Sequence, residues 1–249
     1  MKQIYLSPHL DDAVYSCGGK IAQDIRRGNS VEIWTVFAGD PSSDLTPFAL
    51  ELHARWGAGA ESVAKRRAED IAACGMLGVG HRHLPHPDCI YRRLPLSDEP
   101  VIRTNDDLFL PVRPEEQALI LQIRDEFLQL NPENRPFYCP LVIGGHMDHR
   151  LVRAAAESTG SPLIYYADFP YAADPSFDLE SFIPSGCEPQ EVTLAEEDLR
   201  EWTAAAAAYS SQYSSFWPSI EGMQSAIRAY SRTVPGHTVW KCVAYRGFR

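Results

Sequence analysis

Short apolar runs alternate with longer amphipathic segments along most of this chain. The runs at residues 3–6 and 31–37 are rich in Ile, Val, Tyr and Trp, which predicts buried strands. Residues 14–27 between them predict a helix that stops at a basic pair followed by Gly and Asn. The same reasoning predicts helices over 60–77, 114–130 and 148–158, and strands over 137–143 and 163–166. This order predicts an α/β fold with a Rossmann-like, mostly parallel sheet flanked by helices.

The remaining segments complete a single predicted domain over residues 1–249. Residues 39–59 are rich in Asp, Ser, Pro and Gly, and residues 84–113 hold five prolines and show no periodicity, so both are expected to be loop insertions. Residues 190–230 carry acidic residues before an Ala-rich stretch, which predicts a pair of helices as a C-terminal element.

Two of the predicted strands end in clusters of histidine and aspartate. The clusters are His9, Asp11 and Asp12 after the first strand, and His146, Asp148 and His149 after the strand at 137–143. Ligands of open parallel sheets bind outside the carboxyl ends of the strands, so both clusters are expected at one site.

The residue types predict a zinc site. Catalytic zinc takes three protein ligands from His, Asp or Glu and keeps one position for water. His9 and Asp12 are three residues apart and can turn toward one point, and His149 would supply the third ligand. Asp11 would then lie beside the metal, where a carboxylate can act as general base.

The second cluster offers two further roles. His146, when protonated, could stabilise an oxyanion, and Asp148 could orient a histidine from behind. Simpler interpretations exist for each group alone: Asp11 and Asp12 could cap a helix, and a single histidine at a strand end is usually solvated. The two clusters together favour the metal site.

The motifs Ser7-Pro-His-Leu-Asp-Asp-Ala13 and His146-Met-Asp-His149 resemble those of the LmbE-like (PIG-L) family of zinc-dependent N-acetylglucosaminide deacetylases. The resemblance implies His9, Asp12 and His149 as ligands of Zn²⁺, Asp11 as general base and His146 as the group that stabilises the oxyanion. It further implies a hydrolase that removes an N-acetyl group from an N-acetylglucosamine-type sugar conjugate.

Weaker matches extend the resemblance to roughly residues 2–215. They are Arg66-Arg-Ala-Glu69, Tyr166-Ala-Asp-Phe-Pro-Tyr171 and Tyr209-Ser-Ser-Gln212. The chain departs from the usual pattern at Leu10 and Ala13, where the family carries Pro and Glu. Gly144 stands where the mycothiol branch of the family carries Tyr.

The net charge of the chain limits the classes of molecule that it is expected to bind. The net charge of −10 argues against a general nucleic-acid binder, which needs a basic surface. Local basic groups can still build a sugar pocket, and we expect Arg66, Asp88 and Arg92 to contact the substrate. The sequence leaves open whether the chain forms a homo-oligomer.

Cysteine usage and hydropathy predict the compartment. The six cysteines form no Cys-x-x-Cys pair, and we expect free thiols in apolar surroundings rather than a disulfide framework. A strand predicted from residue 2 leaves no room for a signal peptide, and no apolar run approaches the ~18 residues of a membrane span. The expectation is a cytoplasmic enzyme that does not bind membranes.

Two alternatives remain. One is a zinc amidase of the same fold that acts on another N-acyl or thiol-conjugate substrate. The other is a nucleotide-binding doubly wound domain, for which Gly18-Gly19 provides only part of the glycine motif.

Overall fold

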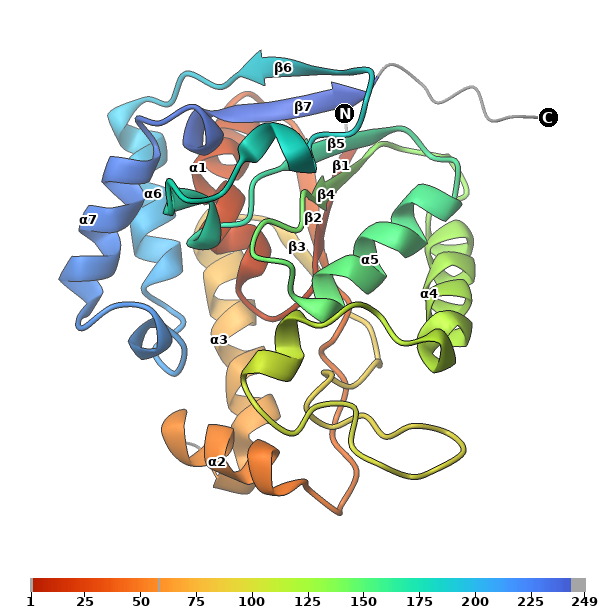
Figure 1. The fold of residues 1–249 in the computed structure, drawn as a ribbon. Coiled ribbons are helices and arrows are strands. Elements are labelled where there is room, and N and C mark those ends of the chain that lie inside the picture. Colours follow the sequence, from red (N-terminus) through yellow and green to blue (C-terminus); the bar gives the residue numbers. More distant parts are fainter. Residues whose placement is uncertain (1, 58, 243–249) are drawn as a thin grey trace.

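One seven-stranded sheet organises the residues that the computed structural model describes, 2–57 and 59–242 (Figure 1). The strand order is β3-β2-β1-β4-β5-β7-β6. The strands are β1 (Lys2–Ser7), β2 (Ser30–Thr35), β3 (Gly80–His83), β4 (Phe137–Pro140), β5 (Leu163–Tyr166), β6 (Cys187–Glu191) and β7 (Thr238–Cys242). The first five strands run parallel, whereas β7 is antiparallel to β5 and to β6. The predicted mostly parallel α/β fold is confirmed.

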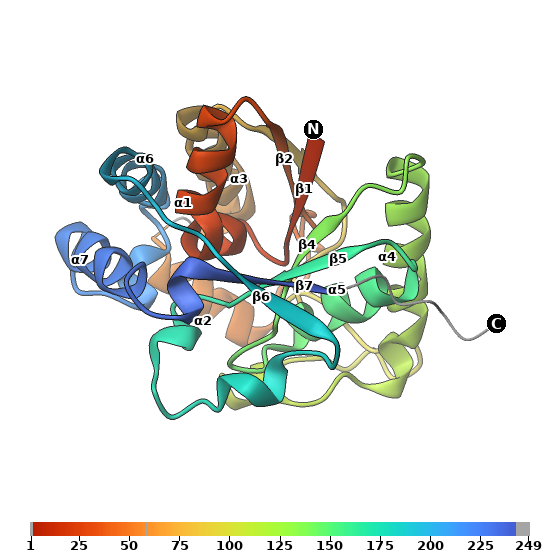
Figure 2. The same ribbon diagram turned by 90° about the horizontal axis from the view of Figure 1, so that it is seen from above.

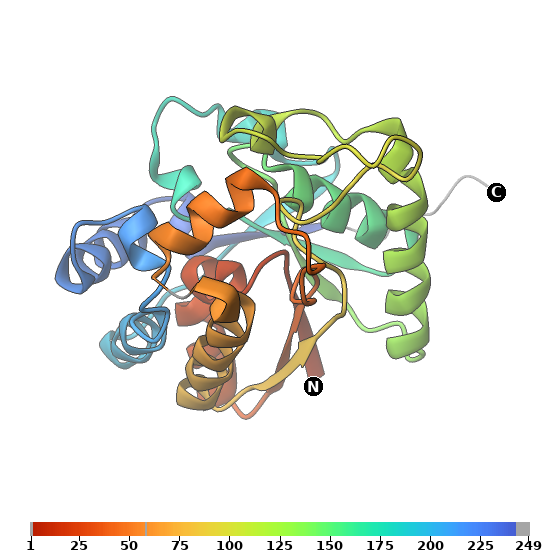
Figure 3. The same cartoon turned by 90° about the horizontal axis from the view of Figure 1, so that it is seen from below.

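Helices cover both faces of the sheet (Figure 2). One face carries α1 (Asp12–Arg26), α3 (Ser62–Leu77), α6 (Glu196–Ala206) and α7 (Ile220–Tyr230). The other carries α4 (Gln117–Leu130) and α5 (Met147–Ser158). In the view from below, α2 (Pro47–Arg55) crosses in front of the sheet (Figure 3). No helix within the described ranges is both long enough and apolar enough to cross a bilayer.

The apolar strands are explained by burial on both faces. In β1, Ile4 and Leu6 belong to the core beneath α4 and α5, while Tyr5 between them belongs to the core beneath α1 and α3. Because the sheet is covered on both sides, the sequence of such a parallel strand is a continuous apolar run rather than an alternation of apolar and polar residues.

Gly18 and Gly19 lie inside α1, where their lack of a side chain leaves room for large side chains of neighbouring segments. A Cβ on Gly18 would come within 2.2 Å of Trp202, and one on Gly19 within 2.6 Å of Leu194. Trp202 in α6 donates from Nε1 to the carbonyl of Val14 at 2.7 Å. The glycines thus serve helix packing rather than a phosphate-binding loop.

Two predicted elements differ from the structure. Residues 39–59 are not all loop, because α2 begins at Pro47 after Thr46, whose side chain accepts from Ala49 N at 3.0 Å. The strand predicted over 137–143 ends at Pro140. The edge strands β3 and β6 were missed because their residues, Gly-His-Arg-His and Cys-Glu-Pro-Gln-Glu, are mostly exposed and polar.

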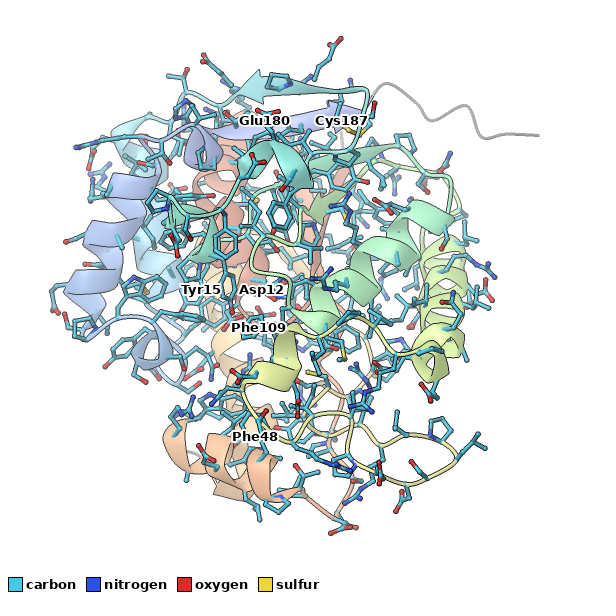
Figure 4. All side chains as sticks on the ribbon, viewed as in Figure 1. Asp12, Tyr15, Phe48, Phe109, Glu180 and Cys187 are labelled. Carbon is cyan, nitrogen blue, oxygen red and sulfur yellow. A yellow bond between two sulfur atoms is a disulfide. The ribbon has the colours of Figure 1, made fainter. Side chains whose placement is uncertain are left out.

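A disulfide joins Cys187 of β6 to Cys242 of β7, so the expectation of free thiols is wrong for this pair. The two residues are direct neighbours across antiparallel strands, a proximity that sequence spacing cannot reveal. Cys17, Cys74, Cys89 and Cys139 are free and buried, as expected. In Figure 4, Cys187 lies near β6 at the top, away from Asp12.

Candidate active site

The turn after β1 is fixed by short hydrogen bonds. Ser7 Oγ donates to the carbonyl of His9 at 2.6 Å and accepts from Ala13 N at 3.0 Å. Asp11 caps α1 with φ of 152°, a conformation that L-residues rarely adopt. Such backbone strain recurs at functional sites, and here it sets the direction of two adjacent carboxylates.

The three predicted zinc ligands converge. Asp12 Oδ2 lies 3.2 Å from His9 Nδ1 and 3.2 Å from His149 Nε2. A tetrahedral ion with zinc–nitrogen and zinc–oxygen distances near ~2.0–2.1 Å separates its ligand atoms by roughly 3.3 Å. His146 also offers a ring nitrogen within 4.8 Å of those of His9 and His149. The carboxylate is the better third ligand because it lies close to both rings and carries charge.

The orientation of His149 provides a test of whether a metal fits. His149 Nδ1 faces Asp168 Oδ1 at 2.8 Å, so this nitrogen carries the proton. In the neutral ring, Nε2 then presents a lone pair to the carboxylate oxygen of Asp12. Two lone pairs at 3.2 Å are unfavourable unless a proton or a metal ion lies between them, so the pair can hold either one, and a metal ion that displaces the proton fits the donor set.

Charge in this region favours a cation as well. Burial lowers the pKa of His149, but Asp12 and Asp168 outweigh burial and raise it to about 9. Burial likewise opposes protonation of His9, whose pKa is nevertheless raised by Asp88, Asp12 and Asp148. The carboxylates that draw protons onto these rings would draw a divalent metal in the same way.

Asp168 is a site residue that the sequence analysis missed. Its Oδ2 accepts from Ile143 N at 2.9 Å while Oδ1 holds His149. One buried carboxylate therefore ties the end of β5 to the loop after β4 and to His149, a predicted metal ligand. Its place two residues after a parallel strand was the available indication.

Asp148 lies behind His9. Its Oδ2 is 3.1 Å from His9 Nε2 and accepts from Cys89 N at 2.9 Å. Burial opposes its ionisation, but Arg92 and His9 hold the pKa of Asp148 below its usual range. Asp148 is thus positioned to orient a ligand histidine, which is the role suggested by its sequence position.

His146 caps α5 through its ring. Nδ1 accepts from Asp148 N at 3.2 Å, so the neutral ring carries its proton on Nε2. Burial and the neighbouring histidines, His9 and His149, lower the pKa of His146 well below its usual value. The group is therefore set up as a neutral hydrogen-bond donor, unlike the protonated form that the sequence analysis considered.

A cavity of about 310 Å³ opens beside these groups. Arg66 projects into it with only 8% of its surface exposed, stacked over Trp56 at 4.8 Å. Its Nη2 is 3.7 Å from Asp11 Oδ2 and its Nη1 is 3.9 Å from Asp88 Oδ2. Burial raises the pKa of Asp11 to about 8, although Arg66 acts in the opposite direction.

Arg92, expected at the substrate, does not line this cavity. Its Nη2 lies 2.7 Å from Asp148 Oδ1 and 2.7 Å from Glu116 Oε1, and its guanidinium stacks over Phe37. The Pro-rich sequence of this loop, which has no periodicity, gave no indication of which side chains would turn inward. Arg92 neutralises Asp148 behind the site.

Aromatic side chains form much of the cavity wall. Tyr15, Asp12 and Phe109, which Figure 4 labels, lie together near the centre of the molecule. Tyr171 occupies the space beside Gly144, where a Cβ would come within 2.7 Å of the ring.

The C-terminal segment completes the wall. Glu69 of α3 accepts from Ser210 Oγ and Ser211 Oγ, each at 2.6 Å, and so fixes the turn that brings Gln212 to the cavity. The two weakly matching segments at 66–69 and 209–212 are therefore in contact.

A larger hollow of about 910 Å³ lies between α4, α5 and residues 181–184. It contains none of the predicted catalytic or metal-binding residues, so the chemistry identifies the smaller cavity as the site.

Comparisons with known proteins identify the family of this chain. Residues 4–159 match the PIG-L family, described as GlcNAc-PI de-N-acetylase. The chain is 30% identical to 2'-N-acetylparomamine deacetylase of Niallia circulans and 31% identical to that of Streptomyces fradiae. These alignments cover 68% and 69% of this chain but only 66% and 58% of the relatives.

A solved structure agrees over the full length. The zinc-inhibited form of teicoplanin deacetylase Orf2 has a TM-score of 0.86 and 29% identity, covering 100% of both chains. The match of the family model to residues 4–159 and the named deacetylase relatives confirm the predicted family: this chain belongs to the PIG-L family of de-N-acetylases.

Proposed function

We propose that this protein is a zinc-dependent hydrolase that removes an N-acetyl group from an amino-sugar conjugate. The observation that carries the proposal is the convergence of His9, Asp12 and His149 at 3.2 Å spacings beside a cavity. The relatives named as acetylparomamine and teicoplanin deacetylases support an N-acetylated sugar as the substrate class.

His9, Asp12 and His149 would hold the ion. When bound, zinc lowers the pKa of water toward ~7 and polarises the amide carbonyl. Asp11 takes the proton of the attacking water and later returns it to the leaving amine. The Nε2 proton of His146 hydrogen-bonds to the carbonyl oxygen as negative charge develops there.

Arg66 and Asp88 would bind the sugar. Among the described residues, Arg66 has Asp11 at 3.7 Å and Asp88 at 3.9 Å as its carboxylate neighbours, and both distances are too long for a hydrogen bond. Its Nε has no partner there either. A buried guanidinium with free donors suits ligand oxygens, and Asp88 offers an acceptor for sugar hydroxyls.

The test combines metal content with acetate release. We expect the wild type to bind about one zinc and His149→Ala to bind none. The wild type should release acetate from N-acetylparomamine or from simple N-acetylglucosaminides. Metal binding without acetate release, but with release of longer acyl groups, would favour the alternative amidase. Absence of metal after zinc addition would contradict the proposal.

A further inference from the structure

One buried hydroxyl in the wall of the candidate active-site cavity lacks a hydrogen-bond partner. Tyr15, labelled in Figure 4, lines the cavity and is only 2% exposed, and its Oη has no partner among the described residues. Other core tyrosines are satisfied: Tyr166 donates to the carbonyl of Leu6 at 2.7 Å. Tyr209 donates to Asp70 Oδ1, also at 2.7 Å. A buried hydroxyl without a partner destabilises the folded state, so its presence in a cavity wall calls for an explanation.

Packing alone does not require the hydroxyl of Tyr15. The ring packs against Tyr209 and Trp217, with ring centroids 5.4 Å apart in both cases. Phenylalanine would make the same ring contacts without burying an oxygen that lacks a partner. Within the part of the chain that the structure describes, packing therefore explains the ring but not the oxygen.

Arg66 provides a second unsatisfied donor in the same cavity. Its side chain is nine-tenths buried, and its Nε has no partner within the described ranges. Two buried donors without acceptors in one cavity indicate that a ligand supplies the acceptors. A sugar, which carries several hydroxyl oxygens, has the chemistry to do so.

The position of Tyr15 on α1 indicates which oxygen it meets. Tyr15 follows Asp11, the candidate base, by one helical turn, and Tyr15 N donates to the carbonyl of Asp11 at 2.9 Å. Asp11 has to reach the nitrogen of the scissile amide. A donor one turn away is suited to an oxygen on a carbon next to the one that carries this nitrogen. In a 2-acetamido sugar whose C1 carries the aglycone, the free hydroxyl in that position is the one at C3.

The protonation state of Tyr15 suits this contact. Burial raises the pKa of Tyr15, and Asp11 and Glu69 raise it further. The phenol therefore keeps its proton and acts as a neutral donor. Because Oη is shielded from solvent, a hydrogen bond formed there does not compete with water.

We propose that Tyr15 is a substrate-positioning residue whose hydroxyl donates a hydrogen bond to the C3 hydroxyl of the amino sugar. The proposal rests on the sugar substrate described under Proposed function. Access of the sugar to Oη requires a small side-chain movement in the cavity wall. Phe216 can provide it, because it lines the cavity, is 44% exposed and contacts Trp217, the neighbour of Tyr15.

The test compares methyl 2-acetamido-2-deoxyglucoside with its 3-deoxy analogue. In the wild type, kcat/KM should be higher for the sugar that has the C3 hydroxyl. Tyr15→Phe should lower kcat/KM for this sugar by about tenfold, mainly through KM, and should leave the value for the 3-deoxy sugar nearly unchanged. The preference for the C3 hydroxyl should therefore fall by about tenfold.

Tyr209→Phe is the matched control. It removes a phenol hydroxyl from the adjoining ring, which lies outside the cavity lining, and should keep the preference for the C3 hydroxyl. The melting temperature should fall in Tyr209→Phe, because Asp70 loses a donor. It should not fall in Tyr15→Phe, because no hydrogen bond is lost there. An unchanged preference in Tyr15→Phe would overturn the proposal, and a lower melting temperature of that variant would then assign the hydroxyl to structure.

Equilibrium binding separates this proposal from the proposed function. The dissociation constants of the two corresponding free amines, measured by calorimetry, do not depend on hydrolysis. A preference for the C3 hydroxyl in binding that Tyr15→Phe removes would support the role of Tyr15 even without acetate release. Absence of acetate release from both N-acetyl sugars would in that case contradict only the proposed function. Failure of the wild type to bind either amine would overturn the role of Tyr15 as well.

Discussion

The two walls of the cavity are built in different ways. On the wall formed by His9, Asp12 and His149, Asp12 Oδ2 lies 3.2 Å from a ring nitrogen of each histidine, and the other ring nitrogens contact Asp148 and Asp168 at 3.1 Å and 2.8 Å. On the wall formed by Arg66, the nearest carboxylate oxygens are 3.7 Å and 3.9 Å away, and Nε has no partner among the described residues.

The difference indicates what each wall binds. A small ion needs preorganised ligands at short, nearly equal distances, and outer carboxylates that hold the rings. A sugar needs donors and acceptors spaced for hydroxyl groups, which fill the wider gaps only when substrate is present. The first wall is therefore suited to the metal and the second to the substrate.

The largest effect is expected from His149→Ala. Loss of the third ligand should abolish metal binding and with it acetate release, because the remaining two residues cannot hold the ion. Metal content and acetate release measure both. His81→Ala changes an exposed histidine on β3 and should leave both unchanged. Full metal content in His149→Ala would contradict the assignment of His149 as a metal ligand.

Asp11→Asn should separate the reaction from metal binding. The amide preserves shape but cannot accept the proton, so we expect turnover to fall by about 10²–10⁴ while zinc content is kept. Asp98→Asn, at an exposed carboxylate far from the cavity lining, is the matched control. Near wild-type turnover in Asp11→Asn would require another base.

Asp168→Asn should weaken metal binding by His9, Asp12 and His149, because Asp168 holds the ring of His149. The amide loses the charge that holds the His149 proton, so metal affinity should fall by about 10–100-fold. Competition with a chelator measures this directly, and excess metal should restore much of the activity. Asp174→Asn, an exposed residue of the same segment, should behave as wild type. A lower melting temperature without change in metal affinity would restrict Asp168 to a structural role.

The convergence of His9, Asp12 and His149 was predictable because it depends on local sequence and on one rule of parallel sheets. His9 and Asp12 share a turn, and His149 follows another strand whose carboxyl end must lie nearby. The fold followed from the same alternation of strands and helices. Edge strands β3 and β6 lack that pattern because solvent, not the core, covers much of their surface.

The contacts that depend on three-dimensional packing could not be predicted. Nothing local distinguishes Arg66, which enters the cavity, from Arg92, which turns behind Asp148. Asp168 could be assigned only with the knowledge that β5 ends beside His149. The packing partner of Gly18 is Trp202, which lies far along the chain. Sequence reasoning therefore located the His and Asp residues that converge at the cavity better than the residues that support them.

The smallest effect is expected from Arg66→Ala, and it should concern substrate binding rather than metal binding. Loss of its hydrogen bonds to substrate should raise KM by about tenfold, with zinc content unchanged. Because Arg66 lowers the pKa of Asp11, its removal should also move the acidic limb of the kcat/KM profile to higher pH. Arg67→Ala, whose side chain pairs with Asp40 outside the cavity lining, is the neighbouring control. A shifted limb with unchanged KM would make Arg66 an electrostatic neighbour of Asp11 rather than a sugar contact, and a loss of zinc would contradict the division between the two walls.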